Sequence, residues 1–128
     1  NILSCSIDAM HRCLDDISTK KQFNSILVDG NKFKTYYDSE QDEFINHICV
    51  IKGDNYYKSI AAASILAKTA RDNYILQLVK DNPELEKYGI QKNKGYGTKE
   101  HMEAIEKYGI TKWHRKSFAP CKDYVNQN

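Results

Sequence analysis

The change of hydrophobic period between residues 47 and 80 is the feature that most limits how this chain can fold. His47–Ile51 is rich in β-forming residues and predicts a short strand. From Lys58 to about Lys80 the apolar residues recur at helical spacing, and alanines crowd the start of this segment at Ala61–Ala63. A strand that runs almost directly into a long helix is typical of an α/β or α+β pattern.

The remaining segments extend this pattern in both directions. Residues 2–18 predict an amphipathic helix, and Ser25–Val28 predicts a short strand that is stopped by Asp29 and Gly30. The predicted elements that follow are an exposed acidic loop at 38–43, a helical turn at 84–88, a loop at 89–97 and a helix at 99–108 that Thr98 caps and Gly109 ends. The 128 residues are enough for one ordinary domain.

Charge is unevenly distributed along the chain. Residues 1–57 hold six Lys and Arg against nine Asp and Glu, a balance of −3, whereas residues 58–128 hold thirteen against eight, a balance of +5. The segment 110–122 has four basic residues and no acidic one, with Trp113, His114 and Phe118 among them. Such a segment suits a polyanion such as a nucleic acid, although a solvated loop has the same composition.

Membrane and metal-thiolate functions find no support in the sequence. No apolar run approaches the roughly 20 residues of a membrane-spanning helix, and the amino terminus lacks the basic lead and unbroken apolar stretch of a signal peptide. The cysteines form no CxxC pair, which indicates buried reduced thiols in a cytosolic protein rather than a zinc site. We therefore expect a cytoplasmic protein with no membrane partner. The four cysteines are Cys5, Cys13, Cys49 and Cys121.

Two aspartates follow the two predicted strands. Asp29 and Asp54 each lie at or just past the carboxyl end of a strand, so neighbouring strands would bring both carboxylates to one edge of the sheet. Such anions repel unless a cation or a proton lies between them. Mg²⁺ takes oxygen ligands and bridges to phosphates, so the pair would be half of a two-metal phosphoryl-transfer site. Each aspartate alone also fits an ordinary turn; their parallel placement favours the metal site.

Small and basic residues follow Asp54. We expect the alanines at Ala61–Ala63 to let the helix lie close against the sheet, which would fix the turn that carries Asp54. The same helix presents Lys68 and Arg71 one turn apart, either to phosphates or, as is commoner, to solvent.

The loop at residues 92–97 combines lysines, glycines and one tyrosine. Tyr96 between Gly95 and Gly97 could stack on a sugar and offer its hydroxyl to a ribose 2′-OH, or it could simply pack down as part of a surface turn. Arg115 offers a bidentate phosphate donor further along. The neighbouring His114 is interpreted as structural, because nothing near it suggests a catalytic triad.

Several stretches together resemble a known family. They are LVDGN (27–31), KGDNYYKSIAAASILAKTARD (52–72), NKGYGTKEHMEAI (93–105) and HRKSFAP (114–120), in an order that covers nearly the whole chain. They resemble type 2 ribonuclease H, the bacterial ribonuclease HII. The resemblance implies a single α/β domain over 1–128 with a ribonuclease H-like fold, in which residues 1–80 belong to the core and 81–128 form a helical, basic substrate-binding tail.

The resemblance also implies an activity. The family's endonucleases cut the RNA strand of RNA–DNA hybrids, including at single ribonucleotides embedded in a DNA duplex. Four carboxylates hold Mg²⁺ or Mn²⁺, and hydrolysis leaves 3′-hydroxyl and 5′-phosphate ends. The third and fourth carboxylates correspond to Asp29 and Asp54, and the tyrosine that recognises the ribonucleotide corresponds to Tyr96. Lys68 and Arg115 are further candidates for substrate binding, and the protein is expected to be a monomer.

One part of the family pattern has no counterpart in these residues. The first two carboxylates belong to a DEAGRG-type motif on an opening strand, and neither Asp8 nor the pair Asp15 and Asp16 sits in such a motif. We therefore expect an incomplete fold that lacks its opening strands, weak or absent cleavage by this chain alone, and an amino-terminal segment as a partner. Two alternatives are a non-catalytic nucleic-acid-binding module and an unstable fragment.

Overall fold

The computed structural model describes residues 1–125, and the chain divides into two units within its longest helix, α2 (Lys58–Asp81). The first unit ends at Leu66 and the second begins at Ala67. The sequence analysis instead expected one domain, with a core over residues 1–80 and a tail from residue 81. Together the units have the mixed α/β composition that the sequence predicts, with a small sheet first and a helical part after it.

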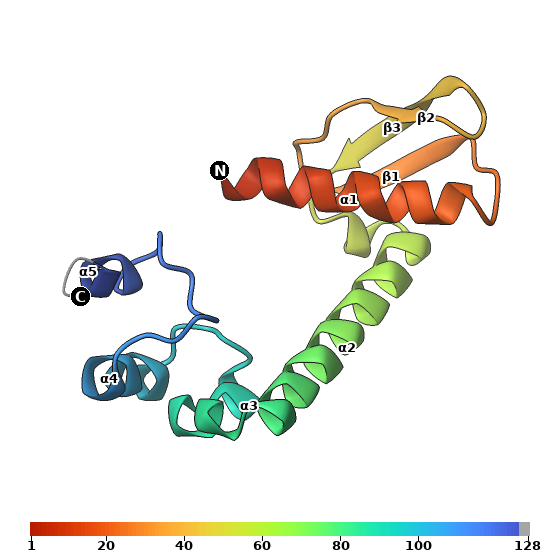
Figure 1. Ribbon diagram of the computed structural model, residues 1–128. Coiled ribbons are helices and arrows are strands. Elements are labelled where there is room, and N and C mark those ends of the chain that lie inside the picture. Colours follow the sequence, from red (N-terminus) through yellow and green to blue (C-terminus); the bar gives the residue numbers. More distant parts are fainter. Residues whose placement is uncertain (126–128) are drawn as a thin grey trace. The chain divides into compact units, whose positions relative to one another are not determined.

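The first unit is a three-stranded sheet covered by one helix (Figure 1). The strand order is β1-β3-β2, with β1 parallel to β3 and β2 antiparallel to it as a hairpin. The register sets Ser25 opposite Asn46 and Asp29 opposite Val50. The elements of this unit are α1 (Ile2–Ser18), β1 (Ser25–Asp29), β2 (Tyr36–Asp38), β3 (Glu43–Val50) and the 3₁₀ helix η1 (Gly53–Asn55).

The core of the first unit lies between α1 and one face of the sheet. Alternate residues of the strands point into it, as the period of two requires, and Leu14 of α1 packs against them. The opposite face leaves Phe44 and Ile48 largely exposed. The buried apolar residues of the strands are Ile26, Val28, Tyr36 and Ile45.

Polar contacts attach α1 to the hairpin. The Tyr36 hydroxyl donates to the Asp15 carboxylate at 2.9 Å, and burial together with that carboxylate raises the pKa of Tyr36 to about 12. The Ser18 hydroxyl donates to Asp38 Oδ1 at 2.5 Å. Asp38 is fully buried, and the hydrogen bonds from Ser18 and Gln41 hold its pKa below the usual value. The sequence analysis missed β2: residues 39–42 of the predicted loop at 38–43 do form a turn, but Asp38 ends β2 and is buried.

The second unit is helical. After the body of α2 it contains η2 (Pro83–Tyr88), α3 (Ile90–Asn93), α4 (Lys99–Tyr108) and α5 (Cys121–Val125). The Thr98 hydroxyl accepts from the His101 amide at 3.3 Å, and Gly109 has φ +74°, so the predicted ends of α4 are confirmed. The buried core residues of the second unit are Ile75, Val79, Leu85, Tyr88, Ile90, Ala104, Ile105 and Cys121.

Helical spacing in the sequence predicts Met102, Ile105 and Tyr108 as the buried stripe of α4; this is confirmed for Ile105 and wrong for the other two, and part of the prediction for the cysteines is also wrong. In α4 the buried residues are His101, Ala104 and Ile105, while Met102 and Tyr108 are exposed. Aromatic and thioether side chains tolerate water at one end, so their presence in a stripe did not identify the buried face. Cys5 and Cys13 on α1 are likewise exposed rather than buried. No helix among residues 1–125 is long and apolar enough to cross a membrane.

Candidate functional site

The first unit brings the surroundings of the two predicted metal-binding aspartates together. Asp29 ends β1, and the Gly30 amide beyond it donates to the Val50 carbonyl of β3 at 2.9 Å. The Gly53 amide donates to Asp29 Oδ1, also at 2.9 Å. Because Asp54 directly follows Gly53, the Asp29 carboxylate is held against the turn that carries Asp54. The condition for this arrangement, that the two strands are neighbours, is met, because β1 pairs with β3.

The turn that carries Asp54 is closed by a glycine and an isoleucine. Gly53 is buried in η1, and a Cβ added there would lie 2.6 Å from Ile60 Cδ1 in the first turn of α2. Lys52, just before it, takes the left-handed conformation with φ +54°. This close approach fixes the path from β3 into α2, and it leaves the Asp54 side chain exposed.

The expectation that the alanine run fixes this turn is wrong. Ala61 is half-buried, but Ala62 and Ala63 are exposed to solvent. The sequence signal for the turn is instead a glycine soon after the strand, followed by one β-branched apolar residue in the next helical turn. Composition alone did not distinguish the two, because any small residue permits close approach.

The donor set of this edge fits a hard divalent cation only in part. Carboxylate oxygens are ligands that Mg²⁺ and Mn²⁺ prefer. One oxygen of Asp29 already accepts from the Gly53 amide, which orients the carboxylate. Among residues 1–125, no three His, Cys, Asp or Glu side chains gather closely enough to hold a metal ion. Asp29 and Asp54 alone would therefore provide only a fraction of the ligands that such an ion takes.

In the second unit, a hydrogen bond from α2 holds the backbone of the loop around Tyr96, and the Tyr96 side chain is exposed. Tyr96 is 69% exposed, so it does not pack down onto the surface. The guanidinium of Arg71 lies 5.6 Å from the ring centroid, and Arg71 Nη1 donates to the Lys94 carbonyl at 3.1 Å. The sequence analysis grouped Arg71 only with Lys68 on the same helix. In the structure, Arg71 contacts the Tyr96 loop.

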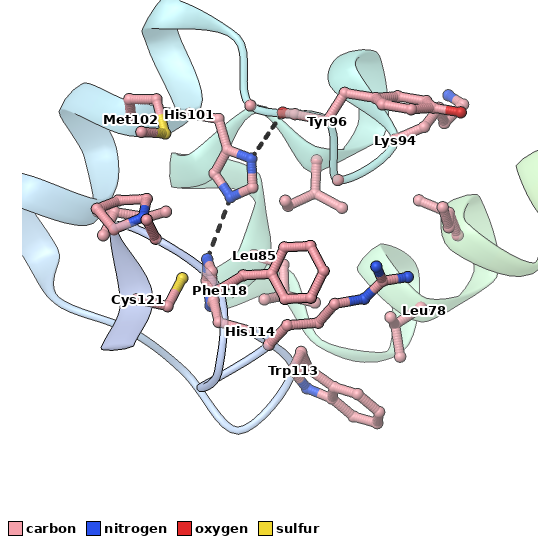
Figure 2. A pocket seen from close by; sticks show the side chains of 18 of the residues that line it. Leu78, Leu85, Lys94, Tyr96, His101, Met102, Trp113, His114, Phe118 and Cys121 are labelled. Carbon is pink, nitrogen blue, oxygen red and sulfur yellow. Dashed lines mark hydrogen bonds between the residues drawn. The ribbon is translucent and has the colours of Figure 1, made fainter. Parts of the chain in front are cut away.

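A cavity of about 420 Å³ adjoins this loop (Figure 2). Its walls combine apolar core side chains with aromatic rings and cations, among them Tyr96, Trp113 and Phe118. Arg115 lines it with its guanidinium 5.4 Å from the Phe118 ring centroid. Lys68 does not line it: its exposed ammonium pairs with Asp72 at 3.3 Å on α2. The structure thus places Tyr96 and Arg115 on one cavity and Lys68 apart from it.

Two histidines that line this cavity contact each other, and the sequence analysis did not predict this contact. His101 Nε2 and His114 Nε2 lie 3.1 Å apart, and His101 Nδ1 lies 2.9 Å from the Tyr96 carbonyl oxygen. Burial, and the neighbouring His101, lower the pKa of His114. The two residues are 13 positions apart on a helix and a loop, so no helical or strand spacing relates them. The one available signal is that His101 falls in the first turn after the Thr98 cap.

Comparison with known proteins relates the whole of this arrangement to one family. The family model described as Ribonuclease HII matches residues 1–121. A Ribonuclease HII from Christiangramia forsetii is 53% identical over 125 residues, which are 98% of this chain and 58% of that protein. One from Cytophaga hutchinsonii is 45% identical over 118 residues, 92% of this chain and 54% of that protein.

A third relative, a Ribonuclease HII from Phocaeicola vulgatus, is 48% identical over 118 residues, again 92% of this chain and 53% of its own length. The chain thus spans somewhat more than half the length of the curated relatives it matches. Both aspartates, the Tyr96 loop and the histidine pair lie within the matched range, residues 1–121. The chain belongs to the ribonuclease HII family.

Proposed function

We propose that this chain supplies Asp29 and Asp54 to the metal site of an endonuclease that hydrolyses the RNA strand of RNA–DNA hybrids, including at ribonucleotides embedded in DNA. The observation that carries the proposal is the hydrogen bond from the Gly53 amide to Asp29 Oδ1, because it holds one carboxylate against the residue that precedes the other. Membership of the ribonuclease HII family supports the same reaction.

The roles of the two aspartates follow from their chemistry. Mg²⁺ or Mn²⁺, when bound, supplies Lewis-acid chemistry: it neutralises phosphate charge and lowers the pKa of water. Asp29 and Asp54 would hold the ion through carboxylate oxygens, and the Gly53 amide would keep Asp29 oriented for it. The products are 3′-hydroxyl and 5′-phosphate ends.

The second unit supplies the contacts to nucleic acid. Tyr96 presents an exposed ring and hydroxyl, which would meet the ribose and its 2′-OH. Arg115 and Lys68 would contact phosphates, Arg115 from beside the aromatic cavity and Lys68 from the surface of α2. We further propose that the protein acts as a cytoplasmic monomer, in keeping with the resemblance on which these roles rest.

The proposal includes slow cleavage by the 128 residues on their own. Two carboxylates are fewer ligands than a two-metal site requires, and residues 1–125 contain no larger cluster. A polypeptide that also carries a DEAGRG-type segment would complete the ligand set. Loss of one metal-holding carboxylate from the completed site should lower the cleavage rate about 100-fold or more, the size of effect that removal of one electrostatic stabiliser has.

The test is cleavage of a DNA duplex with one embedded ribonucleotide, in Mg²⁺ and in Mn²⁺, with and without the DEAGRG-type segment. Asp54→Asn should lower the rate of cleavage by the completed polypeptide about 100-fold or more, while Asp8→Asn, at an exposed aspartate of α1, should leave it unchanged. Robust cleavage that survives both Asp29→Asn and Asp54→Asn would overturn the assignment of the metal site.

A non-catalytic nucleic-acid-binding module is the second candidate, and the small number of metal ligands in residues 1–125 favours it for this chain alone. It predicts duplex binding that weakens with salt and survives Asp29→Asn and Asp54→Asn. Binding of this kind, with no cleavage even when the DEAGRG-type segment is present, would select the second candidate over the first.

A further inference from the structure

The cavity beside the Tyr96 loop is lined by aromatic side chains that remain partly exposed to solvent. Trp113 is 42% exposed and Phe118 is 47% exposed, although both line the cavity together with Tyr96. In the view of Figure 2, Tyr96 and Trp113 lie toward opposite edges of the drawn side chains. The volume of about 420 Å³ falls within the range of about 300–1,000 Å³ that small-molecule sites occupy. Exposed rings around a hollow of this size favour a binding site.

Every side chain of the cavity that carries a full charge at neutral pH is a cation. Arg71 comes from α2, Lys94 from the Tyr96 loop and Arg115 from the segment before α5. Among residues 1–125, none of the three forms an ion pair with a carboxylate. The Arg115 guanidinium lies instead 5.4 Å from the centroid of the Phe118 ring. The charge of the cavity therefore fits a ligand with an anionic group.

An unpaired nucleobase with its phosphates combines the two properties that this cavity selects. Its flat face stacks on aromatic rings, and its phosphates pair with lysine and arginine. A base inside a duplex is stacked between its neighbours, so it has no free face to offer unless it is first extruded. A neutral apolar peptide would use the rings of the cavity and leave its cations without a partner.

We propose that this cavity binds an unpaired nucleobase of single-stranded nucleic acid, with Trp113 and Phe118 against the base and Arg115 on its phosphate. The site goes beyond the proposed cleavage of duplexes, because it uses neither Asp29 nor Asp54 and shares only Arg115 with that reaction. The segment 110–122, which carries all three residues, holds four basic residues and no acidic one, so the same charge continues outside the cavity.

Trp113 reports binding directly, because it is the only tryptophan of the chain. A short oligothymidylate, added without metal, should quench its fluorescence to saturation. Oligouridylate should behave in the same way, because a stacked base is recognised by its face and not by its sugar. An abasic strand of the same length and charge should bind about tenfold more weakly, because it keeps the phosphates and lacks the stacking base. Equal affinity for the abasic strand would contradict the proposal.

A blunt all-DNA duplex provides the second comparison. Lysines and arginines bind its phosphates, so it should associate with the chain in a salt-dependent way. Its bases stay paired and stacked, so the fluorescence of Trp113 should remain nearly unchanged at saturation. Quenching by the blunt duplex as strong as that by oligothymidylate would show that Trp113 responds to phosphates alone, and the proposal would be wrong.

Two exposed aromatic residues of the second unit form a matched pair for substitution. Phe118→Leu keeps an apolar side chain in the cavity and removes the ring, so affinity for oligothymidylate should fall about fivefold while affinity for the abasic strand stays. Tyr108→Leu is the control: Tyr108 is 45% exposed and lies beside Lys87 and Lys107, but it does not line the cavity. The control should keep both affinities. An equal loss in both variants would remove the cavity from the binding site.

Substitution of Arg115 tests the phosphate contact and does not depend on whether Phe118→Leu folds. Arg115→Gln should weaken binding of oligothymidylate and of the abasic strand together. It should also decrease the slope of log binding constant against log salt concentration by about 0.7, the value for one phosphate contact to a single strand. Lys107→Gln, at an exposed lysine outside the cavity, should keep the slope. An unchanged slope for Arg115→Gln would overturn the assignment of the phosphate to Arg115.

Failure of the proposed function gives a different result. If no ribonucleotide-containing duplex is cleaved even with the DEAGRG-type segment, while oligothymidylate still quenches Trp113, the cleavage assignment alone is wrong. If cleavage occurs and oligothymidylate does not quench Trp113, the single-strand site is wrong and the cleavage assignment stands. Quenching by a neutral apolar peptide, with none by oligothymidylate, would assign the cavity to a protein segment instead.

Discussion

The two units of this chain bury polar groups of opposite kind. The first buries an ionised carboxylate, Asp38, which accepts hydrogen bonds from Ser18, Gln41 and the Glu40 amide. The second buries His101 against His114, and burial together with the neighbouring His101 lowers the pKa of His114, which favours its neutral ring. A buried polar group therefore takes the protonation state that its surrounding donors and acceptors impose, and the two units should respond to different changes.

The candidate functional residues differ in the same way. Asp29 is exposed at a strand end and is held by one backbone amide, that of Gly53. Tyr96 is exposed on a loop whose carbonyls are held by the side chains of Arg71 and His101 and, at Tyr96 itself, by the Thr98 amide at 2.9 Å as well. In the first unit the backbone orients a side chain, whereas in the second unit side chains add to the backbone contacts that hold the loop. Substitutions in the second unit should therefore disturb recognition more readily than those around Asp29 disturb the carboxylate.

The largest expected effects separate the two cores. Leu85→Ala, at a residue 1% exposed, should lower the stability of the second unit by about 3 kcal/mol, and Ile45→Ala should do the same to the first. Hydrogen exchange should show protection lost mainly in the unit that carries the substitution. The matched controls are Leu76→Ala and Ile48→Ala, both at exposed positions, where under about 1 kcal/mol is expected. Equal loss of protection in both units would contradict separate cores.

A smaller effect is expected at the turn that carries Asp54. Gly53→Ala places a methyl group 2.6 Å from Ile60 Cδ1, so the isoleucine must change rotamer and the first unit should lose about 1–2 kcal/mol. Ile60→Val removes that terminal methyl, so the double variant should recover part of the loss. Chemical denaturation of the single and double variants measures this. If Ile60→Val gives no recovery, another contact is responsible.

The sequence predicted the elements better than it predicted their contacts. Periodicity located α1, β1, α2 and α4, and the pair Thr98 and Gly109 located both ends of α4, because these signals are local. The same reasoning missed β2, whose three residues depend on β3 and on a buried Asp38. Of the candidate site, Asp29 and Asp54 followed from strand ends. The histidine pair could not be predicted, since it depends on how α4 and the loop after Gly109 pack.

The pH dependence should differ between the units. Burial and His101 lower the pKa of His114, so its unfolded form, with a usual pKa of 6.5, binds protons first as the pH falls. Stability of the second unit should therefore decrease below about pH 6.5. Ser18 lowers the pKa of Asp38, so the stabilisation that this carboxylate gives the first unit persists until the pH falls below its usual 3.8. Hydrogen exchange of each unit, measured at pH 7, 5.5 and 4.5, should thus show that the second unit loses protection first as the pH is lowered. Equal weakening of the first unit at pH 5.5 would contradict this order.

The smallest expected effect concerns Lys68, which tests whether a side chain outside the cavity contributes to the basic surface of the second unit. Its ammonium is exposed and pairs with Asp72 at 3.3 Å. An exposed pair of this kind contributes under about 0.5 kcal/mol, so Lys68→Gln should leave thermal stability almost unchanged.

If Lys68 contacts a phosphate, however, Lys68→Gln should decrease the slope of log binding constant against log salt concentration by about 1 for every duplex, with or without a ribonucleotide. Lys80→Gln, at another exposed position of α2, is the control and should keep the slope. An unchanged slope for Lys68→Gln would remove Lys68 from the surface that binds nucleic acid and would leave the cavity, with Tyr96 and Arg115, as the part of this unit that contacts the substrate.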